Sequence, residues 1–407
     1  MCDSTRMKRI HAIFCQAMFG TWLAFACASA APMISIGPHV AIHMGAEVES
    51  KYMSNITMSV DNANARDDLI LTLTPALELA LFEESPHFDF RLGSKRDFLH
   101  FIQSDHFNEE PWSLNLSTGY NGELFGLELH YDIIETLQNI STIAPGQTSQ
   151  QHIKFDDDIV LDDIENMGFS FNIAFSPKTG MRSGFSLIKN DYRYVSGRPD
   201  ELLDYDVMQI PVDFLYGITP KLESVFGYRF REVSFNGKVP EFKDHYINFG
   251  LVGDITAKSD LELILGYQTR NRSGMKAQNS LAANLNWRYM TTERLHFHLG
   301  GSRDFDAGSS KADGAPSMQV SGINAGFDIF FTPSVVLDSS VRLMHSSYSS
   351  GRKDLGGNVG TMLVVSPRNS NWELQGAYRY DWNAFEAQNS TFDYKNHNVS
   401  LRTSWRY

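Results

Sequence analysis

The chain ends in the stretch VSLRTSWRY, residues 399–407, in which apolar and polar side chains alternate without interruption. Successive side chains of a β-strand point to opposite faces, so this alternation predicts a strand with one apolar and one polar face. Residues 371–382 repeat the pattern, with Trp372 and Trp382 at the two ends of the apolar set. Aromatic residues at both ends of an apolar band suit the two interfaces of a lipid bilayer. The stretch therefore predicts a strand that faces lipid on one side and water on the other.

A second pattern, an apolar residue followed by Ser or Thr and then Pro or a close relative, predicts where such strands are joined. Each copy closes one alternating segment, and the next segment begins within a few residues. Proline suits a tight turn but not the interior of a paired strand, so the copies predict a series of hairpins. The six copies are Phe175-Ser176-Pro177, Ile218-Thr219-Pro220, Ile255-Thr256-Ala257, Met290-Thr291-Thr292, Phe331-Thr332-Pro333 and Val365-Ser366-Pro367.

The whole chain from about residue 39 divides into alternating segments and polar loops. We expect 18 strands, an even number that leaves both termini on one side: 39–49, 68–82, 87–101, 112–120, 124–134, 166–176, 181–194, 205–218, 221–235, 245–255, 260–270, 281–290, 294–304, 318–331, 335–347, 358–365, 371–384 and 396–407. Pro75 interrupts one segment and could itself mark a turn, so 16 strands is the alternative. The longer loops, rich in Asn, Ser, Gly and Asp, are expected at 50–66, 102–111, 135–165, 195–204, 236–244, 271–280, 305–317, 348–357 and 385–395.

Short turns at one end and long loops at the other predict an all-β fold, an antiparallel up-and-down transmembrane β-barrel of about 16–18 strands. Its turns would be periplasmic and its loops external, in the outer membrane of a Gram-negative bacterium, with outer-membrane lipid and lipopolysaccharide as partners. The last strand, which closes on an aromatic residue, resembles the signal that the barrel-assembly machinery recognises. The residues expected to form that signal are Val399, Leu401, Trp405 and Tyr407.

The N-terminus has the features of an export signal. Residues 1–30 are predicted to be a Sec signal peptide, and residues 31–407 a single outer-membrane barrel domain. Lys8 and Arg9 precede an apolar stretch over 13–27, and a small-residue cleavage site, Ala-Ser-Ala, follows. Met7 is the alternative start, because Met7-Lys8-Arg9-Ile10 is the more usual opening of such a signal. A lipid anchor on Cys27 is the alternative, although Phe25 fits a lipobox poorly.

Composition excludes several classes of function. Removal of residues 1–30 takes away all three cysteines, so the mature chain would have no disulfide and no thiolate site. It also removes three of the 35 basic and one of the 48 acidic residues, which leaves a net charge of −15. Nothing resembles a basic stripe, so no nucleic-acid partner is expected. No cofactor is predicted. Beyond the N-terminus no apolar run reaches the roughly 18 residues of a transmembrane helix.

A barrel of this size is wide enough for an aqueous channel, so the polar faces of the strands should line water. Within several strands an acid lies nearer the periplasmic turn and an arginine further out. These residues could pair with one another as wall residues that hold the lumen open, or could form a ladder that selects ions or sugars. The lumen-lining candidates are Arg229, Arg231, Arg270, Arg288, Arg342, Arg379, Arg402, Glu223, Glu262, Asp338 and Glu373.

Other polar groups are weaker candidates for a cation site, a metal site or a catalytic site. The acidic runs 155–158 and 162–165 are expected in the long loop 135–165, which could be solvated, could constrict the pore or could hold a cation. His296 and His298 point to one side of a strand, but the sequence dictates no third ligand, so no metal site is predicted. Hydrolase chemistry needs a nucleophile, a base and an orienting group, and no G-x-S-x-G motif is present. We expect no catalytic residue and no enzyme.

Residues 67–79 and the strands that carry Gly227-Tyr228-Arg229, Gly266-Tyr267-Gln268 and Ala377-Tyr378-Arg379 resemble the β-barrel porin 2 family. The resemblance covers about residues 40–407 and rests on pattern more than on invariant motifs. Members of that family are outer-membrane barrels, many of them found with genes for exopolysaccharide synthesis and secretion. It implies a porin-like passive path for hydrophilic solutes, with exopolysaccharide and polysaccharide-export components as further expectations. The alternatives are a surface-structural or adhesive barrel with a plugged lumen, and a barrel hydrolase.

Overall fold

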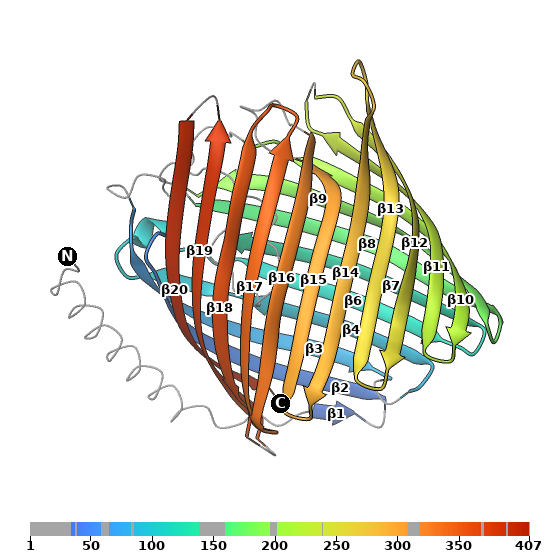
Figure 1. The fold of residues 1–407 in the computed structure, drawn as a ribbon. Coiled ribbons are helices and arrows are strands. Elements are labelled where there is room, and N and C mark those ends of the chain that lie inside the picture. The colour runs from blue at the N-terminus through green and yellow to red at the C-terminus, as the bar shows by residue number, and fades with distance from the viewer. Residues whose placement is uncertain are drawn as a thin grey trace.

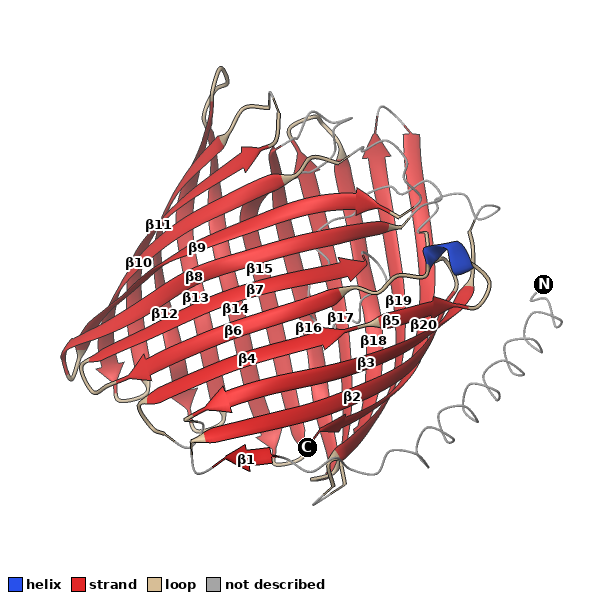
Figure 2. Ribbon diagram, turned by 180° about the vertical axis from the view of Figure 1, so that it is seen from behind, coloured by secondary structure: helices blue, strands red, loops and turns tan. Residues whose placement is uncertain are grey.

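A computed structural model describes residues 34–36, 39–57, 65–82, 85–137, 159–195, 202–237, 239–307, 317–367, 370–387 and 390–406. The predicted signal peptide lies outside the described residues. The described chain is almost entirely β-strand, with one single-turn helix, η1 (Asp105–Phe107), at the rim (Figure 2). No helix in these segments is long and apolar enough to cross a membrane.

The strands form one closed antiparallel barrel (Figure 1). They are β1 (Ile34–Ile36), β2 (Val40–Met53), β3 (Asp68–Leu81), β4 (Phe88–Arg96), β5 (Phe98–Phe101), β6 (Trp112–Asn121), β7 (Phe125–Leu137), β8 (Val160–Ser176), β9 (Thr179–Tyr194), β10 (Tyr205–Thr219), β11 (Leu222–Phe235), β12 (Phe242–Thr256), β13 (Ser259–Arg272), β14 (Gln278–Thr292), β15 (Leu295–Ala307), β16 (Ser317–Thr332), β17 (Val335–Tyr348), β18 (Lys353–Val365), β19 (Trp372–Ala387) and β20 (Ser390–Arg406). Because β4 and β5 share one position and β1 lies beside β2, the barrel has 18 positions. The predicted count of 18 strands is confirmed.

The barrel closes where its first and last long strands meet. Residues Gly45–Met53 of β2 pair with β20 from Arg406 back to Asn398. The remaining edge of β2, residues 40–42, pairs with β1 instead. An unpaired edge exposes backbone N–H and C=O groups, so β1 covers the part of β2 that β20 does not reach.

The tight turns explain the Ser/Thr of the repeat. At the end of β16 the hydroxyl Oγ1 of Thr332 accepts a hydrogen bond from the backbone N–H of Ser334 at 3.2 Å. The same bond, from the residue two positions on, is made by the hydroxyls of Ser176, Thr219, Thr256 and Thr292. A register shift precedes each of these turns. Five copies of the repeat therefore encode a bulge and a hydroxyl-capped turn, and the fourth copy is aligned on Thr292 rather than on Thr291. The sixth copy differs, because Ser366 Oγ donates to Glu373 and the β18–β19 register has no shift.

Pro75 lies inside β3 and is not a turn. It is opposite Ala46 of β2 on one side. On the other side the ladder is interrupted between β4 and β5, next to Asp97, where the missing proline N–H leaves no bond unmade. Thr74 Oγ1 donates to Asp97 Oδ1 at 2.6 Å and joins the two strands across the break. The alternative of 16 strands is therefore wrong.

Side chains alternate between an outer apolar and an inner polar face. On β12, Ile247 and Phe249 are 55% and 59% exposed, whereas Tyr246 and Asn248 between them are buried. Exposed apolar side chains on a closed sheet with a polar interior are what a lipid bilayer requires. The protein is an outer-membrane β-barrel. We call the end with the tight turns the turn end and the opposite end the loop end.

Strands extend further toward the loop end than the sequence indicated. β17 and β18 leave only 349–352 between them, and β19 and β20 leave only 388–389, where loops 348–357 and 385–395 were expected. Residues 162–165 belong to β8, so this acidic run is not in a loop; the run 155–158 lies outside the described residues. A backbone ladder is satisfied whatever the side chains are, so polar strands continue above the lipid, where alternation is not required.

Buried apolar clusters lie at the loop end rather than along a central core. In one of them Ile56 and Phe107 pack with Phe101 and Ile159. The carboxylate of Asp68 supports the same region, because it accepts hydrogen bonds from the backbone N–H groups of residues 103 and 104 at 3.0 and 2.8 Å. A second cluster joins Leu202 and Leu203 to the ends of β11, β12 and β15.

Candidate functional site

The end of the β15–β16 hairpin folds over the inner wall of the barrel. Asp304 Oδ2 on β15 accepts a hydrogen bond from Arg229 Nη2 on β11 at 2.8 Å. Three strands, β12 to β14, lie between these two along the wall. At about 4.8 Å per strand that separation is roughly 19 Å, beyond the reach of an arginine. Arg229 faces inward, on the same side as Tyr246 opposite it, so the hairpin end must lie across the lumen face of β11–β13.

A buried ion network attaches the hairpin end to the wall. Arg270 donates from Nε and Nη2 to the two carboxylate oxygens of Asp244, both at 2.7 Å, and both side chains are 1–2% exposed. Its remaining Nη1 donates to the carbonyl oxygen of Asp306 at 2.5 Å and to Ser317 Oγ at 2.9 Å, one on each strand of the hairpin. Arg231 donates to Asp244 Oδ2 from Nε at 2.9 Å and to the carbonyl of residue 305.

Aromatic rings enclose these arginines. The guanidinium of Arg270 lies 4.8 Å from the ring centroid of Phe242 and 4.9 Å from that of Phe305. The guanidinium of Arg229 lies 4.6 Å from the ring centroid of Tyr246. Cation–π contacts strengthen when water is excluded, as it is around Arg270. Arg229, Arg231 and Arg270 therefore act as wall residues that hold the hairpin.

Glycines on the inner wall leave space in which side chains of the neighbouring strands lie parallel to the wall. A Cβ atom built at Gly266 of β13 would overlap the ring of Tyr246, and one at Gly227 of β11 would overlap the side chains of Asp213 and Asn248. Large side chains thus lie along the wall, over glycines of the neighbouring strand, and do not stand upright into the lumen.

A cavity of about 490 Å³ lies along the inner wall at the seam between β2 and β20, and a second of about 210 Å³ adjoins it. Both are lined by Glu49 and Lys51 of β2 and by Arg402 of β20. Arg402 Nε lies 3.1 Å from Glu47 Oε1, and Arg379 Nε lies 2.9 Å from Asp381 Oδ2. The charges at the seam are therefore largely compensated.

Neutral polar groups complete the wall of the smaller cavity. Ser340, Asn358 and Ser400 line it from β17, β18 and β20. Their side chains make no hydrogen bond to any residue that the structure describes. Amide and hydroxyl groups of this kind can each donate to or accept from a passing hydrated solute.

The other two predicted arginines differ from those in the network. Arg288 on β14 is exposed, stands between Asp260 and His298 in register, and has no ion pair within the described residues. Arg342 on β17 is partly buried, opposite Asn324 and Asn358.

None of the four predicted acids makes an ion pair with a basic side chain of the described residues. Glu262 accepts hydrogen bonds from two asparagine amides of β14 at 2.9 and 3.2 Å. Glu373 accepts from Ser366 Oγ at 2.5 Å and from a glutamine amide. Asp338 faces another aspartate across the ladder, and Glu223 is exposed near the turn end. The structure brings none of these four acids to the arginine of its own strand, whereas Arg379 is paired with a different acid of β19, Asp381. A role of these side chains in solute passage stays a prediction.

Sequence reasoning did not single out Asp244, Asp304 or Lys51. Asp244 was assigned to a loop one residue before its strand, although it continues the alternation of β12. That alternation is the signal that could have found it. The same alternation places Asp304 on the polar face of β15. Its partners carry no signal in the sequence, because they are set by the way the hairpin folds inward.

The histidine pair and the C-terminal strand, the remaining candidates from the sequence, lie outside the ion network. The ring of His296 packs against Phe330, 4.8 Å between centroids. Within the described segments no three His, Cys, Asp or Glu side chains gather to hold a metal ion. Trp405 is opposite Trp372 and Ala46 in register, on the face of β20 that carries Val399 and Leu401. Tyr407 lies outside the described residues, and recognition by assembly machinery stays a prediction.

No family model matches the chain, and no curated protein sequence matches it. Solved structures share the barrel. OpdO of Pseudomonas aeruginosa is 11% identical with a TM-score of 0.47, over 90% of this chain and 97% of that chain. OccAB2 of Acinetobacter baumannii is 9% identical with a TM-score of 0.49, over 90% and 98%. The FrpB iron transporter of Neisseria meningitidis, F5-1 variant, is 8% identical with a TM-score of 0.48, over 90% and 82%. These likenesses concern the fold, and they assign no family and no solute.

Proposed function

We propose that the barrel provides a passive aqueous path across the outer membrane for small hydrophilic solutes. The observation that carries this proposal is the inner wall itself: side chains that lie flat over glycines, cavities at the seam, and charges that are paired within the wall. On this proposal the path is narrowed from one side by the hairpin end that Arg229, Arg231 and Arg270 hold, and the solute passes between that hairpin and the β2–β20 seam.

Single-channel recording in planar bilayers tests the proposal. The purified barrel should give stepwise, ohmic conductance. The absence of conductance at every voltage, with a protein that migrates as a folded barrel, would contradict the channel and favour a structural or adhesive barrel with a plugged lumen. Recording on the Arg270→Ala variant distinguishes a hairpin that narrows the path from one that does not, because release of the hairpin should raise the conductance or its noise.

Export of exopolysaccharide is a narrower form of the same function, and it rests on the sequence resemblance alone. Its test is a deletion strain in which secreted polysaccharide is measured beside uptake of small solutes. Loss of secretion with unchanged uptake would support export, whereas unchanged secretion would leave a general solute path. Polysaccharide-export proteins that co-purify with the barrel would identify the partners.

A further inference from the structure

Two strand pairs, eight positions apart in the barrel, carry the same outward-facing arrangement. On β11 and β19 a tyrosine and a second aromatic residue flank an inward arginine: Tyr228 and Phe230, and Tyr378 and Tyr380. On the following strands, β12 and β20, a lysine and a histidine stand two residues apart: Lys243 and His245, and Lys395 and His397. The registers are the same, because Phe230 is opposite His245 and Tyr380 is opposite His397.

The side-chain geometry is repeated as well. Tyr228 Oη lies 2.7 Å from His245 Nδ1, and the ring centroids of Phe230 and His245 are 5.5 Å apart. In the second copy Tyr378 Oη lies 3.0 Å from His397 Nδ1. The centroids of its second aromatic ring and the histidine are 4.8 Å apart. Each imidazole is thus fixed by a hydroxyl on one nitrogen and by an aromatic ring on one face.

This arrangement leaves the second nitrogen of each ring available. Where the tyrosine hydroxyl donates to Nδ1, the hydrogen of the neutral imidazole resides on Nε2. Nε2 of His245 and of His397 has no partner within the described segments. The ammonium of Lys243 or Lys395 stands one step nearer the loop end on the same face. Each copy therefore presents a cation and a neutral donor side by side.

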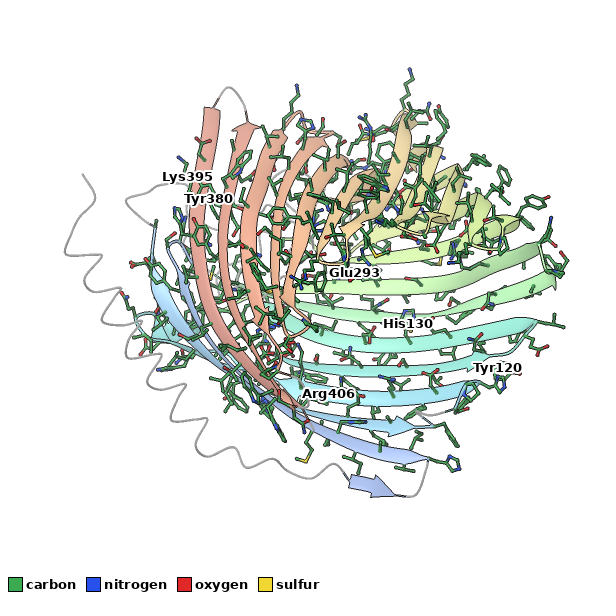
Figure 3. The ribbon with its side chains drawn as sticks, turned by 60° about the horizontal axis from the view of Figure 1, so that its bottom comes forward. Tyr120, His130, Glu293, Tyr380, Lys395 and Arg406 are labelled. Carbon is green, nitrogen blue, oxygen red and sulfur yellow. The ribbon has the colours of Figure 1, made fainter. Side chains whose placement is uncertain are left out.

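Both copies stand at the upper boundary of the apolar surface. Below His245 on the same face of β12 come Ile247 and Phe249, which are more than half exposed. Below His397 on β20 come Val399 and Leu401. In Figure 3 Tyr380 and Lys395 lie together near the loop end of their strands. Donors at this height meet the headgroups of the outer leaflet.

The histidine is not a general feature of the strand pairs. Tyr267 of β13 faces outward like Tyr228, but the corresponding residue of the next strand is Asn279, which bonds to Thr269 at 2.9 Å. An outward tyrosine on one strand is therefore not by itself accompanied by the histidine on the next.

We propose that these two clusters are binding sites for the phosphate groups of outer-leaflet lipid. A phosphate accepts charge-assisted hydrogen bonds from the ammonium and from Nε2–H, while its acyl chains lie on the apolar band below. Lys243 Nζ lies within 3.5 Å of Glu232 Oε1 and 3.9 Å of Glu241 Oε2. No carboxylate of the described residues is within ion-pair distance of Lys395. The β19–β20 site is the stronger one, since its lysine has no competing acid.

Lipid retention tests the sites. The full barrel is reconstituted in phosphatidylcholine nanodiscs that contain diphosphoryl lipid A, and the bound lipid A is counted by native mass spectrometry. Replacement of all four residues (Lys243→Gln, His245→Gln, Lys395→Gln and His397→Gln) should lower the apparent affinity about tenfold or more, because charged hydrogen bonds are lost. The Lys395→Gln/His397→Gln pair should lose more than the Lys243→Gln/His245→Gln pair.

A matched control uses the same residue types outside the clusters. His345 and Lys353 face outward at the loop end of β17 and β18, without a ring contact among the described residues. The His345→Gln/Lys353→Gln variant should retain lipid A like the unchanged protein. Equal retention by the fourfold variant, equal binding of dephosphorylated lipid A, or displacement by millimolar inorganic phosphate would overturn the proposal. Conductance should be unchanged in every variant, because the substituted residues face outward. A negative result for lipid binding would therefore leave the channel proposal untouched.

Discussion

Arg229 on β11 and Asp304 on β15 form an ion pair, 2.8 Å between Nη2 and Oδ2, although three strands separate them along the wall. The contact exists because the end of the β15–β16 hairpin lies on the inner face of β11–β13. The sequence leaves open whether the longer loop 135–165 is solvated, constricts the pore or holds a cation, and its residues 138–158 lie outside the described residues. Among the described residues, the hairpin that ends at residues 307 and 317 is an inward element.

Loss of a network arginine should destabilise the barrel. Arg270→Met removes one partner from a buried ion pair, which costs about 3–5 kcal/mol of unfolding free energy. Asp244→Leu should cost more than Arg270→Met, because it removes the shared carboxylate from both Arg231 and Arg270 and leaves Arg231 only the more distant Asp304, at 3.8 Å. Urea unfolding in lipid vesicles, followed by tryptophan fluorescence, measures both. Equal stability of the two variants would contradict a network centred on Asp244.

Ion selectivity should respond to Arg288 more than to Arg229. Arg288 is exposed and has no ion pair within the described residues, whereas the Arg229 side chain is 19% exposed and is paired with Asp304. Arg288→Gln should therefore shift the reversal potential in a KCl gradient toward cation preference. Arg229→Gln serves as the control, with a smaller shift. The reverse order would show that the paired arginines face the ions.

A bulky residue at Gly266 should push Tyr246 from the wall into the lumen. Gly266→Leu places atoms where the tyrosine ring now lies, and overpacking of this kind costs about 1–3 kcal/mol. Single-channel conductance should fall. Gly376→Leu is the matched control, since a Cβ there meets nothing within 4 Å. Unchanged conductance in Gly266→Leu would mean that the ring does not border the path.

The hydroxyl-capped turns should each make a small contribution to stability. Thr332→Val removes the bond to the N–H of Ser334 at 3.2 Å while it keeps the shape of the side chain. We expect a loss of about 0.5–1.5 kcal/mol, toward the lower limit because the turn is exposed. Thr332→Ser retains the hydroxyl and should unfold at nearly the unchanged urea concentration. A loss in Thr332→Ser as large as in Thr332→Val would assign the effect to the methyl group.

The strands could be predicted from the sequence because lipid on one side and water on the other impose alternation on each of them. The turns could be predicted because Ser or Thr recurs where a bulge and a tight turn need a local hydroxyl. The strand ends at the loop end could not be predicted, because side chains above the lipid need not alternate between apolar and polar. Pro75 was ambiguous for a similar reason, since only the break between β4 and β5 shows that its missing N–H is harmless.

The candidate site was predicted less completely. Alternation was sufficient to nominate Arg229, Arg231 and Arg270 as inward residues. Their partners could not be predicted, because pairing an arginine with the acid of its own strand ignores contacts made across the wall. Asp304 reaches Arg229 only through the inward fold of a hairpin, and no spacing along the chain records that fold.

The seam between β2 and β20 has a consequence for biogenesis. Its paired residues stand about 350 positions apart in the chain, for example Lys51 and Ser400, so the ring exists only once the last strand has been delivered. A chain interrupted earlier has two free sheet edges and no enclosed interior. Premature termination therefore yields no enclosed pore, so a truncated chain does not open the outer membrane to solutes.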